Sequence, residues 1–374
     1  MNVYWYWPFL RREELRLAAG VVEPGDELLV HVTGREHDPA VSTVPGCTVV
    51  AALPNVPERR ERSPSWLASR ATTYLRRARV RDHTVRAGRF DVCHVMYLNR
   101  FTDPLALRVL PRRTALVCSV HDVVPHERRL PPRVERGVLR ALYDAAGILV
   151  VHHEFVRDRL VSEFAVDPAR VSLVPHQVVE APTVAGETSE RSSSPVVLFF
   201  GAFRRNKGID VLLDAIRRVG GRDAATFVFA GSGAPDMERL VTTAAERDPR
   251  IRAELGFATG TRKHELFRDA DLVVLPYTSF ASQSGVLHDA YAHGVPAVVS
   301  DVGALGDTVR EDATGWVVPP SDADALAKTI TDVLADRPAR DRASDAAAAV
   351  AWARRPVVVG KQLRAVYERA LDGT

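Results

Sequence analysis

"VVLFFGAFRRNKGIDVLLDAI", residues 196–216, joins an apolar run to a glycine turn, a basic cluster and an amphipathic stretch. The apolar run has the length of a buried strand, and Gly201 permits a sharp turn after it. The apolar spacing that follows predicts a helix beginning at Gly208. Strand, glycine turn and helix in this order are typical of the βα units of a parallel sheet.

The same alternation of apolar runs and helical stretches extends along the whole chain. Short apolar runs predict thirteen strands in all, at 2–7, 27–32, 47–53, 91–97, 114–120, 147–152, 170–176, 196–201, 226–231, 251–257, 272–277, 296–301 and 315–320. Helical spacing in the second half lies at 208–219, 234–247, 261–270, 284–293 and 322–335. Because many of the runs are apolar on both faces, we expect two doubly wound parallel sheets. Ligands of such sheets bind beyond the carboxyl ends of the strands.

A polar stretch separates the two halves. Residues 180–195, "EAPTVAGETSERSSSP", are rich in Ser, Pro and Gly, which is typical of a linker. We therefore predict a first domain over 1–180, a linker over 181–195 and a second domain over 196–355. A last helix around 356–371 is expected to return to the first domain, so that 356–374 packs on it.

Bulk composition excludes several classes of protein. The 374 residues carry a net charge of only +3, so nothing in the total demands nucleic acid. There is no apolar run of the roughly 18 residues that a membrane helix needs, and "MNVYWYWPFLRREE" at the start lacks the features of a signal peptide. The three cysteines, Cys47, Cys93 and Cys118, fit neither a zinc site nor a disulfide framework. A cytoplasmic protein is the simplest interpretation.

Five segments of the second half, taken in order, resemble the nucleotide-sugar half of glycosyltransferase family 4. They are "FFGAFRRNKGIDVLLDA", "FVFAGSG", "HELFRDADLVVLPY", "SQSGVLHDAYAHGVPAVVSDVGALGDTV" and "GWVVPPSDADALAKTI", within residues 196–335. The first half resembles the same family more loosely, through "SVHDVVPH" and residues 148–176. The resemblance implies the GT-B fold, with two Rossmann-like domains and a cleft between them. It also implies sugar transfer from a nucleotide-diphosphate sugar with retained anomeric configuration, without a metal or other cofactor.

The resemblance assigns the donor phosphates to the basic cluster. Lys207 matches the family's phosphate-binding lysine, which stabilises charge on the departing diphosphate. The family's partner arginine normally follows the strand-end glycine, but here Ala202 follows Gly201. Arg204 is our preferred replacement and Arg205 the alternative. A solvated basic turn is the competing interpretation of this cluster.

The turn before residue 285 would hold the rest of the donor. The resemblance implies that the backbone N–H groups of Ser284, Gly285 and Val286 meet the diphosphate at a helix N-terminus. Asp289 matches the carboxylate that accepts hydrogen bonds from the nucleotide ribose. Gly231 ends a second strand-to-glycine turn of the same kind. The competing interpretations are a helix start without ligand and a surface aspartate.

One family carboxylate is missing. It falls on Ala281, where relatives contact hydroxyls of the donor sugar. Ser282 and Gln283 follow directly, and both can hydrogen-bond sugar hydroxyls. We expect these two residues to replace the carboxylate, although its loss is also what an inactive relative would show.

In the first half, His121 follows a strand and matches a histidine that lies beside the donor sugar in relatives. There it would orient the sugar or stabilise charge, and a histidine that only closes the strand end is the alternative. The segment "HHE" at 152–154 resembles a metal motif, but adjacent residues of a strand point to opposite faces, so we expect no metal there.

Five residues of the first half are candidates for binding the acceptor. Trp7 and Phe9 lie near the end of the first predicted strand. In that strand Val3, Trp5 and Trp7 share one face, and Tyr4 and Tyr6 share the other. Packing of Trp7 and Phe9 in an aromatic core is an equally good interpretation of these two residues. The other three candidates follow the fourth predicted strand: Tyr97, Asn99 and Arg100.

Residues 58–89 hold ten arginines against three acidic residues, together with Trp66, Leu67, Tyr74 and Leu75. A basic helix with apolar points can lie on an anionic membrane surface. A solvated basic face and a site for an anionic acceptor are equally good interpretations.

The leading hypothesis is therefore a retaining glycosyltransferase that acts on a glycan, a lipid-linked or a small-molecule acceptor. The alternatives are a non-catalytic GT-B relative that binds nucleotide sugar or supports a partner enzyme, and another GT-B enzyme such as an epimerase or a phosphorylase. A nicotinamide enzyme is disfavoured, because no G-x-G-x-x-G opens the first helix.

Overall fold

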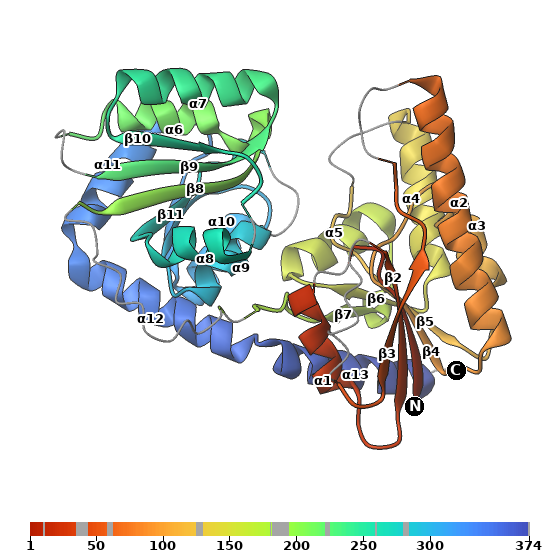
Figure 1. The fold of residues 1–374 in the computed structure, drawn as a ribbon. Coiled ribbons are helices and arrows are strands. Elements are labelled where there is room, and N and C mark those ends of the chain that lie inside the picture. Colours follow the sequence, from red (N-terminus) through yellow and green to blue (C-terminus); the bar gives the residue numbers. More distant parts are fainter. Residues whose placement is uncertain are drawn as a thin grey trace. The chain divides into compact units, whose positions relative to one another are not determined.

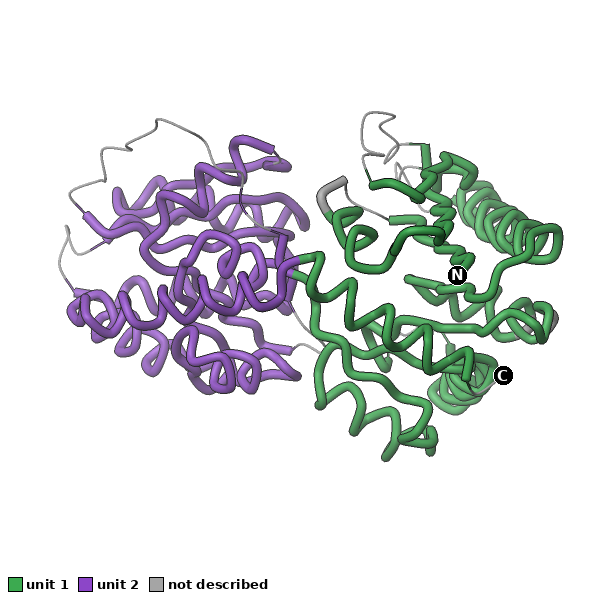
Figure 2. Tube along the Cα trace, turned by 90° about the horizontal axis from the view of Figure 1, so that it is seen from below, with its two compact units in different colours: residues 1–177, 356–374 green, residues 178–355 purple. Residues whose placement is uncertain are grey.

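The computed structural model describes residues 1–9, 12–34, 44–57, 63–124, 130–179, 181, 194–220, 225–258, 260–279 and 284–372. The chain divides into two compact units, drawn in different colours in Figure 2. Residues 1–177 and 356–374 form unit 1, and residues 178–355 form unit 2. Most of the expected linker lies outside the described residues.

Unit 1 contains a parallel sheet of seven strands in the order β3-β2-β1-β4-β5-β6-β7 (Figure 1). Its strands are β1 (Asn2–Tyr6), β2 (Glu27–Thr33), β3 (Cys47–Leu53), β4 (Val92–Val95), β5 (Ala115–Ser119), β6 (Ile148–Val151) and β7 (Val171–Leu173). Its helices are η1 (Arg12–Leu17), α1 (Ala18–Val21), α2 (Pro64–Ala87), α3 (Asp103–Ala106), η3 (Leu107–Val109), α4 (Pro132–Ala145), α5 (Glu154–Phe164), η4 (Pro168–Arg170) and α13 (Pro356–Asp372).

Unit 2 contains a parallel sheet of six strands in the order β10-β9-β8-β11-β12-β13. Its strands are β8 (Val196–Phe203), β9 (Thr226–Gly233), β10 (Ile251–Leu255), β11 (Leu272–Leu275), β12 (Ala297–Ser300) and β13 (Gly315–Val318). Its helices are η5 (Arg205–Lys207), α6 (Ile209–Ile216), α7 (Pro235–Arg247), α8 (Gly260–Arg268), α9 (Gly285–Ala292), α10 (Leu305–Asp312), α11 (Ala323–Ala335) and α12 (Arg337–Ala353).

Both sheets are doubly wound, as the alternating pattern predicts. Strand order reverses between β1 and β4 in unit 1 and between β8 and β11 in unit 2, and crevices for ligands form at such reversals. Each sheet has apolar cores on both faces. In unit 2, β8 sends Val197 and Phe199 into the core below α6, α7 and α11, and Leu198 into the core around α9. Burial on both faces explains why the strands read as unbroken apolar runs.

The aromatic strand β1 shows the same division within unit 1. Val3, Trp5 and Trp7 enter the core that α1 and α13 cover, whereas Tyr4 and Tyr6 enter the core with α4 and α5. This confirms the two predicted faces. Each fully buried aromatic side chain contributes on the order of 2–3 kcal/mol of hydrophobic stabilisation.

The C-terminal helix α13 packs on unit 1 through a backbone contact at two glycines. A methyl group added at Gly20 would lie 2.1 Å from the Val357 carbonyl oxygen, and one added at Gly360 would lie 2.3 Å from the Leu17 carbonyl oxygen. Only glycine at both positions lets α1 and α13 approach this closely.

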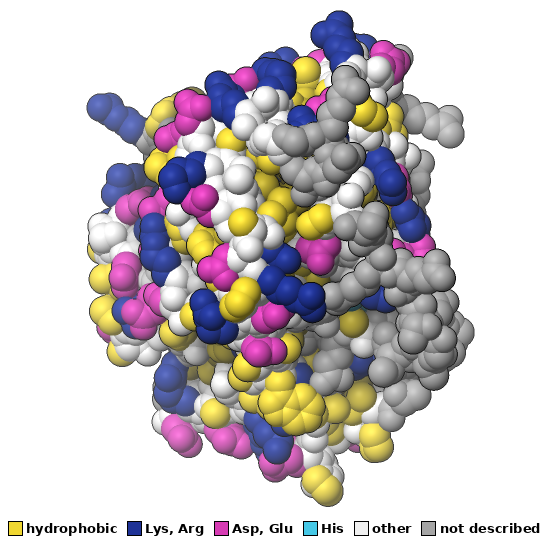
Figure 3. Space-filling model, turned by 90° about the vertical axis from the view of Figure 1, so that its left-hand side faces the viewer, with side chains coloured by type: hydrophobic (Ala, Val, Ile, Leu, Met, Phe, Trp, Pro, Cys, Tyr) yellow, Lys and Arg dark blue, Asp and Glu magenta, His cyan; other side chains and the backbone are white. Residues whose placement is uncertain are grey.

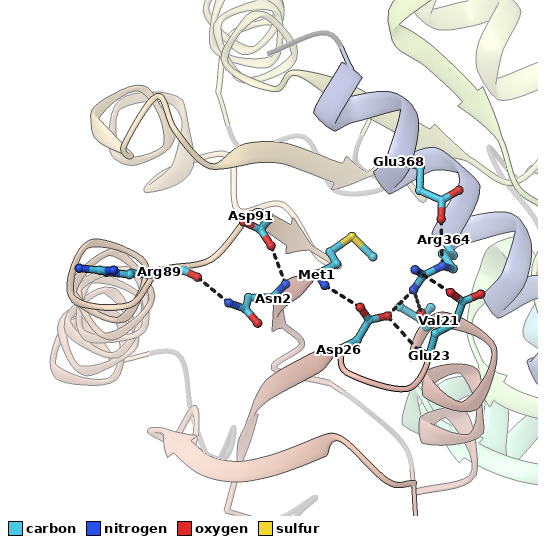
Figure 4. A network of polar contacts seen from close by, with 9 residues as sticks. All are labelled: Met1, Asn2, Val21, Glu23, Asp26, Arg89, Asp91, Arg364 and Glu368. Atoms are coloured by element: carbon cyan, nitrogen blue, oxygen red, sulfur yellow. Dashed lines mark hydrogen bonds and ion pairs between the residues drawn. The ribbon is translucent and has the colours of Figure 1, made fainter.

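Charged groups fix the edge of this contact (Figure 4). Arg364 Nη1 of α13 donates to Asp26 Oδ2 at 2.5 Å and to the Val21 carbonyl at 2.8 Å. The Met1 ammonium donates to Asp26 Oδ1 at 2.6 Å. Burial alone would raise the pKa of Asp26, but these cations and the Glu23 N–H outweigh it and lower the pKa to about 2. The ion pair therefore persists through the physiological pH range.

Charged side chains of the two signs are mixed on one face of the protein (Figure 3). On the face drawn in Figure 3, Lys and Arg side chains stand among Asp and Glu side chains and form no single basic patch. Exposed ion pairs such as Arg310–Asp301 and Lys328–Asp332, both at 2.5 Å, belong to unit 2. Such pairs contribute little to stability, so the cores carry the fold.

Gly360→Ala is expected to lower the free energy of unfolding by about 2 kcal/mol or more, because the new methyl group meets backbone that cannot move aside. Gly137→Ala is the matched control. Gly137 lies in α4 with open space around it, and alanine there should raise the free energy by up to about 1 kcal/mol. Urea unfolding of both variants measures the difference. Equal stability of the two variants would show that the glycine contact does not hold α13.

Candidate functional site

Glycines shape the carboxyl ends of the central strands in unit 2. A methyl group on Gly231 would lie 1.9 Å from the Gly201 carbonyl oxygen on the neighbouring strand, and one on Gly208 would lie 1.8 Å from the Pro276 carbonyl oxygen. All three glycines have positive φ, which other residues adopt only with strain. The close approach at Gly208 brings η5 against the end of β11.

Lys207 therefore lies against an aromatic ring. Its Nζ is 3.5 Å from the centroid of the Tyr277 ring, within the range of a cation–π contact. The Tyr277 hydroxyl lies 3.0 Å from Ser284 Oγ, in a buried hydrogen bond. Burial, and then the charge of Arg204, lower the pKa of Lys207 to about 8. Lys207 is a desolvated cation, linked through Tyr277 to the residue that begins α9.

The two candidate arginines differ in their surroundings. Arg205 Nη2 pairs with Asp236 at 2.5 Å, and its side chain is 82% exposed. Arg204 is also exposed, and its charge acts on Lys207. An exposed cation beside Lys207 is free to swing toward an anion at the same place, which favours Arg204 over Arg205. Both assignments remain predictions.

The start of α9 offers backbone donors. Ser284 is the N-cap residue, and the first turn of any helix leaves its N–H groups without partners in the helix. Gly285 is exposed, and a side chain there would meet nothing within 4 Å. Val286 follows in the same turn, with a methyl carbon 3.4 Å from the place of a side chain on Gly201. Ala281, Ser282 and Gln283 lie outside the described residues.

Asp289 has a partner that the sequence does not reveal. Lys263 Nζ of α8 lies 2.5 Å from Asp289 Oδ1, and both side chains are about three-quarters buried or more. His293 Nδ1 donates to the Asp289 carbonyl at 2.8 Å. The lysine fixes one oxygen of the carboxylate, and the other oxygen remains to accept a hydroxyl. No sequence motif indicates Lys263 as the partner of Asp289, because Lys263 comes from another helix.

In unit 1, His121 lies in a group of aromatic rings. It stacks on Tyr97 with ring centroids 4.4 Å apart, and His152 lies 5.0 Å away. His121 Nε2 donates to the Met96 carbonyl at 3.0 Å, which leaves Nδ1 as the acceptor. Burial, and then His176, lower the pKa of His121 to about 4. The imidazole is therefore neutral near pH 7.

The structure separates the five acceptor candidates. Trp7 and Tyr97 line one cavity of unit 1, and the exposed Phe9 packs edge-on against Tyr97 at 5.3 Å. Asn99 Oδ1 accepts from the Phe101 N–H at 2.9 Å, and Arg100 pairs with the buried Glu135. These last contacts hold the loop, so Asn99 and Arg100 have structural roles as well.

Sequence reasoning assigned no binding role to the remaining polar residues that line this cavity. His94, Ser119 and Gln177 lie on it, together with His152 and His176. The strand alternation places His94 on an inward face, but its partner Tyr367 comes from α13, which no local pattern connects with β4.

The basic helix α2 is not a uniform solvated face. Arg77 and Arg81 are buried, and Arg81 Nη1 pairs with Asp103 at 2.8 Å. Leu67 and Leu75 are about half exposed. Among the described helices, including α2, none is long and apolar enough to cross a bilayer.

Comparison with known families covers both units. The profile described as glycosyl transferase 4-like domain matches residues 12–176, and the profile described as glycosyl transferases group 1 matches residues 194–336. The chain belongs to the group 1 glycosyltransferases. The two matches correspond to the halves that the sequence motifs indicate.

Curated relatives carry transferase names. The D-inositol 3-phosphate glycosyltransferase of Mycolicibacterium vanbaalenii is 28% identical over 385 residues, which covers 94% of this chain and 82% of that protein. The uncharacterized glycosyltransferase MJ1607 of Methanocaldococcus jannaschii is 32% identical over 178 residues, or 46% of this chain and 40% of the relative's length.

Two solved structures share this fold along nearly their whole length. Sucrose-phosphate synthase from Thermosynechococcus elongatus aligns over 100% of both chains, with a TM-score of 0.76 and 18% identity. HepE of Anabaena, solved with UDP-glucose, aligns over 99% of this chain and 100% of its own, with a TM-score of 0.67 and 18% identity. These likenesses confirm the GT-B fold.

Lys207→Met is expected to raise the free energy of unfolding at pH 7 by about 1 kcal/mol. The lowered pKa means that folding penalises the charged amine, and the lost cation–π contact offsets part of this gain. The penalty is complete below pH 8 and is relieved as pH rises toward 10.5, so the gain should shrink over that range. Urea unfolding at pH 7 and pH 10 measures it. Lys328→Met, on the surface of α11, should change little, and a clear loss of stability in Lys207→Met would contradict a desolvated cation.

Proposed function

We propose that this chain is a retaining glycosyltransferase, which transfers a sugar from a nucleotide-diphosphate sugar to a hydroxyl of a glycan, a lipid-linked or a small-molecule acceptor. The observation that carries the proposal is the arrangement of Lys207, Tyr277 and Ser284. It sets a desolvated cation beside the N-terminus of α9, and a helix N-terminus attracts anions. A diphosphate is the leaving group that such a site suits.

In this proposal the protein stabilises the departing charge. Lys207 and Arg204 face the phosphates, and the N–H groups of Gly285 and Val286 donate to them from fixed positions. Preorganised donors and cations of this kind lower the barrier without a metal, so we propose none. The leaving phosphate accepts the proton of the incoming hydroxyl, which makes a protein nucleophile unnecessary.

The remaining donor contacts follow from position. Asp289 accepts from the ribose hydroxyls through the oxygen that Lys263 does not hold. The neutral His121 contacts the donor sugar as a hydrogen-bond partner, since its low pKa excludes a cationic role near pH 7. Ser282 and Gln283 take the place of the missing carboxylate. HepE, which shares the fold and was solved with UDP-glucose, supports a nucleotide sugar as the donor class.

A non-catalytic relative is the second candidate. Ala202 and Ala281 stand where the family's arginine and carboxylate are expected, and neither carries a functional group. Such a protein would bind nucleotide sugar without turning it over. Measuring binding and turnover on the same sample separates the two candidates.

Lys207→Ala should reduce turnover at least about 100-fold with the protein still folded, because the leaving diphosphate loses a fixed cation. The assay is release of nucleoside diphosphate from a panel of nucleotide sugars, read by mass spectrometry. Lys328→Ala, at an exposed position on α11, is the control and should keep wild-type turnover. Near-wild-type turnover in Lys207→Ala refutes the phosphate role. Binding without turnover of any donor by the unmodified chain refutes the enzyme and favours the second candidate.

We also propose that unit 1 contacts the inner face of an anionic membrane through α2 in a cytoplasmic protein. Leu67 and Leu75 supply exposed apolar groups among arginines, and Trp66 lies beside them in the sequence. Basic residues near an anionic surface contribute about 1 kcal/mol each, and the leucines would anchor the helix in the headgroup layer.

The double variant Leu67→Ser with Leu75→Ser should reduce binding to anionic vesicles at least about fivefold, because two apolar anchors are lost. Co-sedimentation with phosphatidylglycerol-containing vesicles measures it at low and at high salt. Leu240→Ser, a partly exposed leucine of α7, is the control. Absence of salt-sensitive binding by the unmodified chain removes the membrane proposal and leaves a solvated face or an anionic-acceptor site.

A further inference from the structure

A cavity of about 60 Å³ lies in unit 1 at the carboxyl ends of β1, β4, β5 and β6. Besides the strand ends, η1 and α13 line it, the latter through Val359 and Leu363. This volume accommodates a small polar group or a few water molecules. Its walls contain several polar atoms whose hydrogen-bonding direction the structure determines.

The first of these atoms, Ser119 Oγ, ends a buried series of hydrogen bonds. Trp5 Nε1, which can only donate, lies 2.8 Å from the Tyr367 hydroxyl oxygen. Tyr367 lies 2.6 Å from His94 Nδ1, and His94 Nε2 lies 2.9 Å from Ser119 Oγ.

Three contacts join four donors, so one donor is left over whichever nitrogen of His94 carries the proton. A proton on Nδ1 would leave the Tyr367 hydroxyl unpaired in the apolar core, whereas a proton on Nε2 leaves the Ser119 hydroxyl on the cavity wall, where a ligand can accept from it. The second assignment is favoured, because an unpaired donor in an apolar core is costly. Burial, and then His121, lower the pKa of His94 to about 3, so its ring is neutral and carries a single N–H. Tyr367 then donates to His94 Nδ1, and His94 Nε2–H donates to Ser119. The Ser119 hydroxyl is left to donate, and no acceptor for it lies among the described residues. Ser119 lines the cavity.

Three more residues of the cavity wall have a buried polar atom with no hydrogen-bond partner in the described part of the chain. The atoms are Trp7 Nε1, His152 Nε2 and Gln177 Oε1. His152 Nδ1 donates to the Val174 carbonyl at 2.9 Å, and burial keeps this ring neutral by lowering its pKa, so Nε2 is an acceptor. Gln177 Nε2 donates to the Glu14 carbonyl, which leaves Oε1 as an acceptor.

The wall therefore combines two donors, Trp7 and Ser119, with two acceptors, His152 and Gln177. Unpartnered buried polar atoms are costly, so their grouping around one cavity indicates a ligand that completes them. A phosphate or carboxylate only accepts and an ammonium only donates, whereas a hydroxyl does both. Among the described residues that line the cavity, Glu14 is the only Asp, Glu, Lys or Arg, and a carboxylate disfavours an anion.

We propose that this cavity is a subsite for a neutral, hydroxyl-bearing group, such as part of a polyol ring, recognised by Trp7, Ser119, His152 and Gln177. The inference deepens the proposed function and rests on it for the identification of this group with the acceptor. If it is correct, the part of the acceptor that enters this cavity is an uncharged polyol. Any anionic part of the acceptor then lies outside the cavity.

The test is a titration of the ¹⁵N-labelled full chain with myo-inositol, followed through the indole N–H signal of Trp7. That signal is identified by its loss in Trp7→Phe. A saturating shift with myo-inositol is expected, and inorganic phosphate at the same concentration should leave the signal unchanged. No shift with myo-inositol or with UDP-glucose, or an equal shift with phosphate, overturns the proposal.

Variants separate this site from an indirect effect. Gln177→Met keeps the side-chain length and removes the acceptor, so it should weaken myo-inositol binding about tenfold, and Ser119→Ala should act similarly. Gln362→Met is the matched control, because Gln362 is exposed on α13. Wild-type affinity in folded Gln177→Met and Ser119→Ala overturns the proposal. A shift with UDP-glucose, but with neither UDP nor myo-inositol, assigns the same hydroxyl site to the donor sugar rather than the acceptor.

Donor hydrolysis, measured without polyol, distinguishes failure of this inference from failure of the proposed function. Lys207→Ala should reduce hydrolysis of the donor that the panel identifies at least about 100-fold and leave the myo-inositol shift intact. Hydrolysis without any indole shift refutes the cavity alone. An indole shift that Gln177→Met weakens, in a chain that turns over no donor, supports the cavity as a polyol site and refutes the transferase.

Discussion

The backbone contact between Gly20 and Gly360 is the constraint on which unit 1 depends. It admits α13, from the far end of the sequence, to the face of the sheet that Val3 and Trp5 cover. Once packed there, the helix supplies Tyr367, which fixes the proton of the buried His94, and it supplies apolar lining for the cavity. Packing and chemistry are coupled here, because Tyr367, which orients His94 and through it Ser119, is part of the apolar core.

A similar approach of backbones organises unit 2. Gly208 against the Pro276 carbonyl brings Lys207 over Tyr277, and the Tyr277 hydroxyl reaches the start of α9. Holding a cation in such a place opposes folding, since burial lowers the pKa of Lys207. The same desolvation strengthens the attraction of an anion, because charges interact more strongly where water is excluded. The desolvation that makes the charged Lys207 unfavourable for folding is therefore the same property that its proposed role in binding a diphosphate requires.

The sequence predicts most of the fold, because local patterns determine it. All thirteen strands form near the predicted positions, since apolar runs and glycine turns are properties of neighbouring residues. The proposed donor residues Lys207, Gly208 and Gly285 could be named from the sequence for the same reason, because each lies in a short motif. Sequence patterns could not reveal partners that come from distant elements. Lys263 beside Asp289, and Tyr367 beside His94, depend on how helices pack, and spacing along the chain carries no trace of that packing.

The two units carry different electrostatics, and this difference constrains the chemistry that each can do. Unit 2 presents a cation and helix N–H groups at its strand ends, which select an anion by charge. Unit 1 presents neutral imidazoles, because burial lowers the pKa values of His94, His121 and His152. Neutral rings with fixed tautomers recognise a hydroxyl by matching donors to acceptors, and they discriminate through the cost of leaving a buried polar atom unpaired. Charge would then hold the leaving group, and hydrogen-bond direction would select the hydroxyl group.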